Sequence, residues 1–167
     1  MKKLGLDAST TTVGYAFVDG KEVIDIGFIP INKEKSIRDK VQLTMDTITE
    51  LDPFGDIEKI YIEDSLSGFS RGRTSQQTII KLAKFNAVLV YCLEFAYGEI
   101  VDGVNPMTAR KNLFGKARKQ GVTAKDFVKK EINCLYNLEE YVKLTKTGLW
   151  DKRNMDAYDA LVCALYE

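Results

Sequence analysis

The sequence predicts an α/β domain built on a mixed five-stranded sheet with helices on both faces. Three observations lead to this prediction. The first thirty residues form three short apolar-rich segments separated by turn residues, the pattern of an antiparallel meander. After them, segments of strand length alternate with segments of helical period. The length of 167 residues suits one domain, and 45% hydrophobic residues suffice to fill its core.

The strands are recognised by short apolar runs that end at turn residues. Asp19-Gly20 is a two-residue hairpin signal, so the second and third strands are expected to pair as direct neighbours. The fourth segment alternates apolar and polar residues, as a strand with one buried face does. The expected strands are Lys3–Ala8, Val13–Asp19, Glu22–Ile29, Ile57–Asp64 and Glu99–Val104.

The helices follow from apolar residues at intervals of three and four. In the segment that starts at Thr74, apolar residues occupy both sides, so its second half is expected to be buried all round. Residues 65–73 are expected to form a basic loop, and residues 137–152 a loop or a lid. The expected helices are Ser36–Leu51, Thr74–Tyr97, Pro106–Phe114, Thr123–Tyr136 and Asn154–Tyr166.

The composition excludes several kinds of site. There is no histidine, which removes Ser-His-Asp and Cys-His catalysis and every histidine metal site. Three scattered cysteines without a CxxC pair argue against zinc and suggest buried thiols in a reducing cytoplasm. Asp7 interrupts the apolar start too early for a signal peptide, and the longest apolar run, Ala87–Leu93, is far too short for a membrane span. The expected location is therefore the cytoplasm.

The formal net charge of zero conceals a segregation along the chain. Residues 1–64 hold 8 basic and 13 acidic side chains, whereas residues 65–130 hold 12 basic and 4 acidic ones. Residues 131–167 are again acidic, with 4 basic and 7 acidic side chains. Such a distribution fits a polyanion-binding face formed by the middle third of the chain, and equally the solvated faces of ordinary surface helices.

Four carboxylates stand out by their positions. Asp7 and Glu63 lie where two apolar strands end, and each points to the opposite side from its apolar neighbours. Asp156 and Asp159 are three residues apart and so share one face of the last helix. Taken singly, each has an ordinary explanation: a turn cap for Asp7, an exposed strand end for Glu63, and helix-dipole complementarity for the pair.

Taken together, the four carboxylates suggest a metal site. Clustered carboxylates repel one another unless a cation lies among them. Hard divalent ions prefer oxygen ligands, so Mg²⁺ is expected, with Mn²⁺ as a substitute. Two such ions about 4 Å apart can activate a water and stabilise the leaving oxygen of a phosphodiester. In a chain without histidine, this is the catalytic machinery that the residues best support.

Three motifs in order resemble the RuvC family of Holliday junction resolvases, and together they span nearly the whole chain. Leu4–Ser9 (LGLDAS), leading to Val13-Gly14-Tyr15-Ala16, resembles the opening of that family. Ile62-Glu63-Asp64 resembles its second acidic motif, and Asp156–Leu161 (DAYDAL) resembles its closing D-x-x-D-A helix. The resemblance is strongest to the phage branch, including resolvases of lactococcal phages.

The resemblance implies an RNase H-like fold, whose strand order agrees with the one expected here. It also implies a homodimer that cuts four-way and other branched DNA with Mg²⁺, using Asp7, Glu63, Asp156 and Asp159 as metal-binding catalytic residues. Two sites related by a two-fold axis would give paired nicks. The sequence does not tell the preferred cleavage site, nor whether a host branch-migration motor is a partner.

Further residues are candidates for contacts with DNA. Asn105–Gly115, followed by Thr123-Ala124-Lys125, resembles a family stretch in which Lys111 and Lys125 match DNA-contacting lysines. The resemblance also implies an aromatic wedge after Glu63, for which Phe69 and Leu66 are candidates; Phe69 could equally be a buried anchor of its loop. By charge alone, further phosphate contacts are expected at Arg71, Arg73, Arg110, Lys116, Arg118 and Lys119.

Three other functions remain as alternatives. Asp7–Thr12 followed by Asp19-Gly20 also resembles the phosphate loop of the actin and sugar-kinase class, but that class needs two such lobes and this chain has room for one. Another RNase H-like nuclease, acting on RNA–DNA hybrids or in strand transfer, would use the same fold. A non-catalytic junction-binding protein is the third, although all four carboxylates are present.

Overall fold

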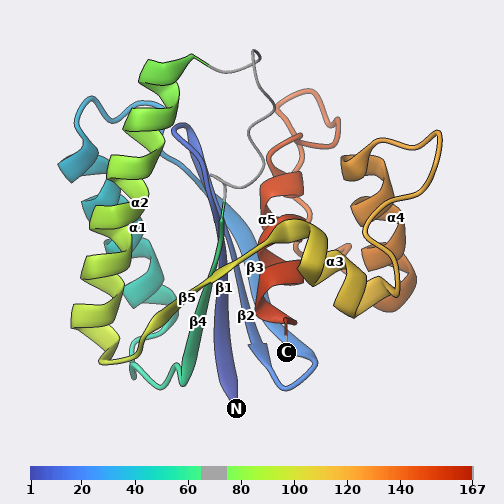
Figure 1. Ribbon diagram of the computed structural model, residues 1–167, viewed down its shortest axis with the longest axis horizontal. Helices are drawn as coiled ribbons and strands as arrows, with labels where there is room; N and C mark the ends of the chain where they lie inside the picture. The colour runs from blue at the N-terminus through green and yellow to red at the C-terminus, as the bar shows by residue number, and fades with distance from the viewer. Residues whose placement is uncertain (65–74, 167) are drawn as a thin grey trace.

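The structure, a computed structural model, describes residues 1–64 and 75–166 (Figure 1). The expected order of elements is confirmed, with bounds that differ by a few residues at most. The strands are β1 (Lys2–Ala8), β2 (Thr12–Asp19), β3 (Glu22–Pro30), β4 (Lys59–Glu63) and β5 (Val101–Val104). The helices are α1 (Ile37–Leu51), α2 (Gln76–Tyr97), α3 (Pro106–Phe114), α4 (Ala124–Leu135) and α5 (Asn154–Ala164).

The five strands form one mixed sheet in the order β3-β2-β1-β4-β5. The first three strands pair antiparallel, and β1 then pairs in parallel with β4, which pairs in parallel with β5. Helices α1 and α2 cover one face of this sheet, and α5, α3 and α4 lie on the other (Figure 1). Strand β1 is therefore at the centre of the sheet, with one hydrophobic cluster on each side.

Local sequence signals explain where the helices begin and end. The side chains of Ser36, Ser75, Asn105 and Thr123 accept hydrogen bonds from the first-turn amides of α1, α2, α3 and α4. Gly98 and Gly115 follow α2 and α3 in the left-handed conformation, which glycine adopts without a steric penalty.

Helix α2 departs from the sequence-based prediction. Leu82, Phe85, Leu89 and Leu93 are buried against the sheet and α1, but the opposite side is not covered. There, Tyr91 is 67% exposed and Phe95 is 83% exposed. The prediction that the second half of α2 is buried all round is therefore wrong, because the helix lies on one face of the sheet and its outer side reaches the surface.

The expectation of three buried thiols is also only partly met. Cys163 is buried within α5, Cys92 is half-buried, and Cys134 is exposed near the end of α4. The apolar stripe of α4 consists of Phe127, Val128 and Ile132, so Cys134 is outside the packed side of that helix. Within the described residues, no helix is both long and apolar enough to cross a membrane.

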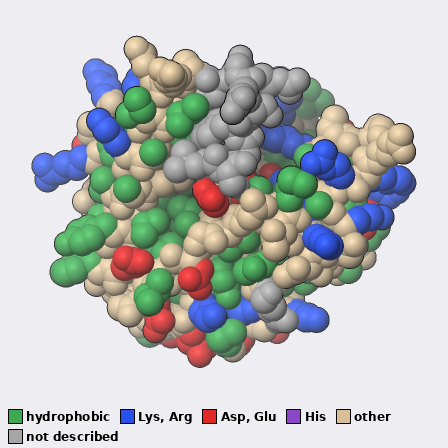
Figure 2. Space-filling model, viewed as in Figure 1, with side chains coloured by type: hydrophobic (Ala, Val, Ile, Leu, Met, Phe, Trp, Pro, Cys, Tyr) green, Lys and Arg blue, Asp and Glu red, His purple; other side chains and the backbone are tan. Residues whose placement is uncertain are grey.

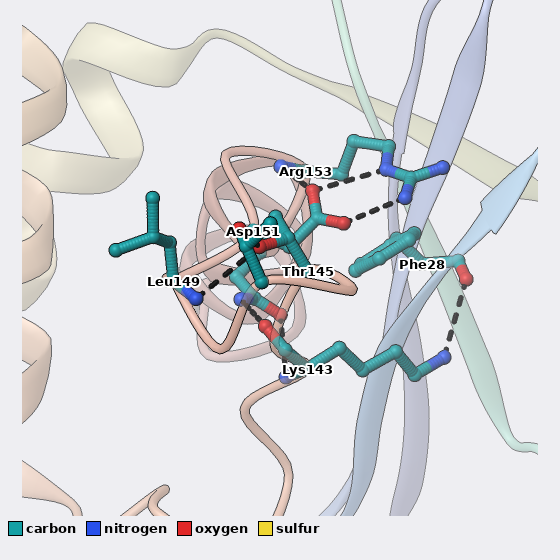
Figure 3. Close-up of polar contacts among 8 residues, drawn as sticks. Phe28, Lys143, Thr145, Leu149, Asp151 and Arg153 are labelled. Atoms are coloured by element: carbon teal, nitrogen blue, oxygen red, sulfur yellow. Dashed lines mark hydrogen bonds and ion pairs between the residues drawn. The ribbon is translucent and has the colours of Figure 1, made fainter.

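Residues 137–152, expected as a loop or lid, fold back on themselves and are tied to the sheet (Figure 3). Lys143 Nζ donates a hydrogen bond to the carbonyl oxygen of Phe28 at 3.5 Å, and the same ammonium lies 4.7 Å from the centre of the Phe28 ring. The guanidinium carbon of Arg153 lies 4.7 Å from the centre of the same ring, and Arg153 forms an ion pair of 2.6 Å with Asp151. Asn154 bonds to both the amide and the carbonyl of Lys143. These contacts fix the start of α5.

Candidate active site

Strands β1 and β4 bring the first two candidate carboxylates together. The two strands run in parallel with Leu6 opposite Ile62, so Asp7 and Glu63, the next residues, lie side by side at the same edge of the sheet. Because side chains alternate along a strand, Asp7 points to the same face as Gly5. That is the face on which α5 packs.

Two glycines allow α5 to approach this face closely. A Cβ atom on Gly5 would collide with the backbone oxygen of Ala160, and one on Gly14 would collide with the backbone oxygen of Asp156. Glycine in the interior of a strand often marks such a close backbone approach. The absence of two side chains on β1 and β2 therefore lets α5 lie directly over Asp7, with Asp156 and Asp159 in its first two turns.

Three of the four candidate carboxylates converge. Asp7, Glu63 and Asp159 each offer a carboxylate oxygen, and these atoms all lie within 4.8 Å of one another. Asp156 is not part of this group of three, although its charge acts on Asp7 and Glu63. Three carboxylate oxygens at this separation suit a hard divalent cation, because oxygen ligands bind such ions at about 2.0–2.6 Å.

The electrostatics of the cluster show how strongly it favours a positive charge. Burial raises the pKa of Asp7 well above its usual range, and the neighbouring charges of Glu63 and Asp159 raise it further. Burial, with the charge of Asp159, raises the pKa of Glu63 to about 7. The pKa of Asp156 is also raised by burial. A bound cation would remove this repulsion and keep the carboxylates ionised at neutral pH.

Arg110 lies inside this site. From α3 it forms a 2.9 Å ion pair with Oδ1 of Asp159, and both side chains are largely buried. Burial raises the pKa of the Asp159 carboxyl, and the Arg110 guanidinium opposes that rise. Arg110 was expected by charge alone to contact phosphate, and the structure shows it paired with a carboxylate of the candidate site.

Lys125 is the second basic group close to the carboxylates. It stands in the first turn of α4, and its positive charge lowers the pKa of Asp7, Glu63 and Asp156 against the larger effect of burial. The sequence resemblance expected a DNA-contacting lysine at this position. Here its charge acts at the same edge of the sheet as the carboxylates.

The remaining basic candidates lie at the surface around α3 and the turn that follows it. Lys111, Arg118 and Lys119 are exposed, and Lys116 forms a 3.7 Å ion pair with Glu131. Figure 2 shows Lys and Arg side chains gathered on the side of α3 and α4. The candidates Leu66, Phe69, Arg71 and Arg73 lie outside the described residues.

Sequence reasoning missed the pairing of Arg110 with Asp159 and the part that the glycines play. Arg110 and Asp159 are 49 residues apart, and nothing in the local sequence distinguishes Arg110 from the other basic residues around it. Gly5 and Gly14 did carry a signal, because glycine is unfavourable in the interior of a strand unless something approaches it closely.

No protein-family model and no curated protein matches this sequence. Among solved structures, RuvC of Thermus thermophilus is similar over 99% of this chain and 92% of its own, with a TM-score of 0.68 and 17% sequence identity. T. thermophilus RuvC in complex with a Holliday junction substrate is similar over 99% and 91%, with a TM-score of 0.69 and 18% identity. At this identity the comparisons establish the fold: the chain has the RNase H-like architecture of RuvC.

Proposed function

We propose that this protein is an endonuclease that resolves four-way and other branched DNA junctions with Mg²⁺ or Mn²⁺. The observation that carries the proposal is the convergence of Asp7, Glu63 and Asp159 within 4.8 Å, on a fold shared with a protein solved in complex with a Holliday junction. The three acidic motifs support the same reaction. Membership of the phage branch rests on those motifs alone.

In this proposal, Asp7, Glu63 and Asp159 hold the metal, and Asp156 completes the set of four carboxylates. Two ions, when bound, would supply an activated water and stabilise the leaving oxygen of the phosphodiester. Arg110 would help to hold the carboxylate of Asp159 in place, through their ion pair of 2.9 Å. The buried setting would strengthen the attraction of the positive charges, the bound ions and Arg110, for the phosphate that is cut.

The basic side chains would hold the DNA backbone. Lys125 lies near the carboxylates, and the exposed Lys111, Arg118 and Lys119 extend the positive surface away from them. Contacts of this kind bind phosphates and fix the position of the duplex without reading its sequence. They would therefore suit an enzyme that selects DNA by its branched shape.

Paired nicks require two active sites, and α2 supports the proposal of a homodimer. Its outer side carries Ile80, Val88, Tyr91 and Phe95 at intervals that place them on one stripe, all of them exposed. Tyr91 and Phe95 stack with their ring centres 6.4 Å apart. An exposed apolar stripe of this kind is typical of an interaction surface, and a two-fold axis through it would pair two copies.

The test is cleavage of a labelled, immobile four-way DNA junction in Mg²⁺, compared with a linear duplex and an RNA–DNA hybrid. The proposal expects symmetric nicks on the junction by the wild type. Asp7→Asn should bind the junction but not cut it, whereas Asp46→Asn on the exposed side of α1 should cut normally. Cleavage of the hybrid alone would point to a ribonuclease H-type activity, and binding without cleavage to a non-catalytic junction-binding protein.

A further inference from the structure

A second basic site lies on the other side of the sheet from Lys125. It is a cavity of about 210 Å³ between the turn after β1, the start of α1 and the second turn of α2. Lys35, Lys40 and Lys81 line it together with Thr10 and the buried Phe85. One acidic residue, Glu34, also lines the cavity. The charged side chains around the cavity therefore sum to a net charge of +2.

The three lysines are not neutralised by the rest of the described structure. Within residues 1–64 and 75–166, none of them forms an ion pair with a carboxylate. The ammonium of Lys40 donates a hydrogen bond to the carbonyl oxygen of Thr10, which is an uncharged acceptor. Lys40 is half-buried, so its charge is held in place beside the cavity without a negative partner. Such a group favours a bound anion.

The position of the cavity relates it to the candidate active site. Thr10 follows Asp7 by three residues, so their Cα atoms can be at most about 11 Å apart. The cavity therefore lies close in space to the candidate active site. Lys125 approaches the carboxylates from the face covered by α4, whereas the cavity belongs to the face covered by α1 and α2. Basic groups therefore stand on both sides of the edge that carries Asp7.

We propose that this cavity binds a backbone phosphate of the DNA strand close to the phosphate that is cut. The inference rests on the proposed nuclease function and adds a contact on the α1–α2 side of the sheet. The ammonium groups of Lys35, Lys40 and Lys81 would surround one phosphodiester. The Thr10 hydroxyl would be a further hydrogen-bond donor. The strand would then be held on both sides of the carboxylates, which fixes the scissile phosphate over them.

The experiment measures junction affinity as a function of salt concentration by fluorescence anisotropy. The variant is Lys35→Gln/Lys81→Gln, which keeps Lys40 and its contact with Thr10. The matched control is Lys21→Gln/Lys59→Gln, two exposed lysines at the opposite end of the sheet. Loss of one phosphate contact should lower the slope of log K against log[salt] by about 0.9, with no change in the control.

Ethylation interference and a phosphate titration distinguish the outcomes. The inference expects that ethylating one phosphate near the cut, other than the phosphate that is cut, weakens binding of the wild type but not of the double variant. If the wild type binds no junction, the proposed function fails together with this inference. If it binds and cuts, but the double variant keeps the slope of the control, only the cavity assignment is overturned. Binding of inorganic phosphate that the double variant loses, with an unchanged DNA slope, would also overturn it.

Discussion

Replacing Glu63 by Gln is expected to stabilise the metal-free protein at neutral and alkaline pH. The carboxylate of Glu63 lies within 4.8 Å of those of Asp7 and Asp159, and burial, with the charge of Asp159, raises its pKa from 4.5 to about 7. Between pH 4.5 and about 7, the folded protein therefore holds a proton on Glu63 that the unfolded chain has already lost. A glutamine fills the same space without an ionised form, so it avoids the cost of charging this position.

The size of the effect follows from proton linkage. Below pH 4.5 the carboxyl is protonated in both states, and the wild type and Glu63→Gln should differ little. Between pH 4.5 and 7 the wild type loses stability progressively, because folding then requires proton uptake. Above pH 7 the full difference between a pKa of 4.5 and one of about 7 corresponds to about 3 kcal/mol at 1.36 kcal/mol per pKa unit. For a domain of this size, that is roughly 6–12 °C in Tm.

The assay is urea unfolding in buffer that contains a chelator, at intervals from pH 4.5 to pH 8. Glu50→Gln, an exposed position on α1, is the control and should stay within about 0.5 kcal/mol of the wild type throughout. Saturating Mg²⁺ should then raise the stability of the wild type more than that of Glu63→Gln. The reasoning is refuted if Glu63→Gln is no more stable than the wild type at pH 8, or if the difference does not change with pH.

Three further predictions concern the packing, the DNA surface and the dimer. Gly5→Ala should lower the free energy of unfolding in urea by about 1–3 kcal/mol, because the added Cβ would push α5 away. Gly103→Ala, with open space around it, should lower it far less. Equal losses of stability in the two variants would contradict the close approach of α5 to Gly5. Lys111→Ala should lower the salt slope of junction binding by about 0.9, and an unchanged slope would remove Lys111 from the interface. Phe95→Ser should shift sedimentation from dimer to monomer; a wild type that is already monomeric at micromolar concentration would argue against the apolar stripe of α2 as the dimer surface.

Much of the fold could be predicted from the sequence, because its signals are local. The Asp19-Gly20 turn, the spacing of apolar residues in the helices and the alternation before Glu63 each depend on residues close in sequence, and the order of strands and helices follows from them. The alternation rule also indicates that Asp7 shares a face with Gly5. It therefore allowed the two strand-end carboxylates to be chosen before their neighbours in space were known.

The rest depends on contacts between distant residues. The apolar stripe that ends at Phe95 looks the same in the sequence whether its own sheet or another molecule covers it, so the burial of α2 could not be deduced. The ion pair of Arg110 with Asp159 requires α3 and α5 to be placed side by side. Residues 137–152 have no helical or strand period, and contacts with distant residues, such as that with Phe28, show how they are held.

The central claim is that the carboxylates of Asp7, Glu63 and Asp159 form a divalent metal site. The most direct measurement is a Mn²⁺ titration followed by electron paramagnetic resonance of the free ion, on the wild type, Asp7→Asn and the exposed control Glu50→Gln. The account expects saturable binding of up to two ions by the wild type and the control, and a loss of at least tenfold in affinity for Asp7→Asn. Equal Mn²⁺ binding by Asp7→Asn and the wild type would contradict it.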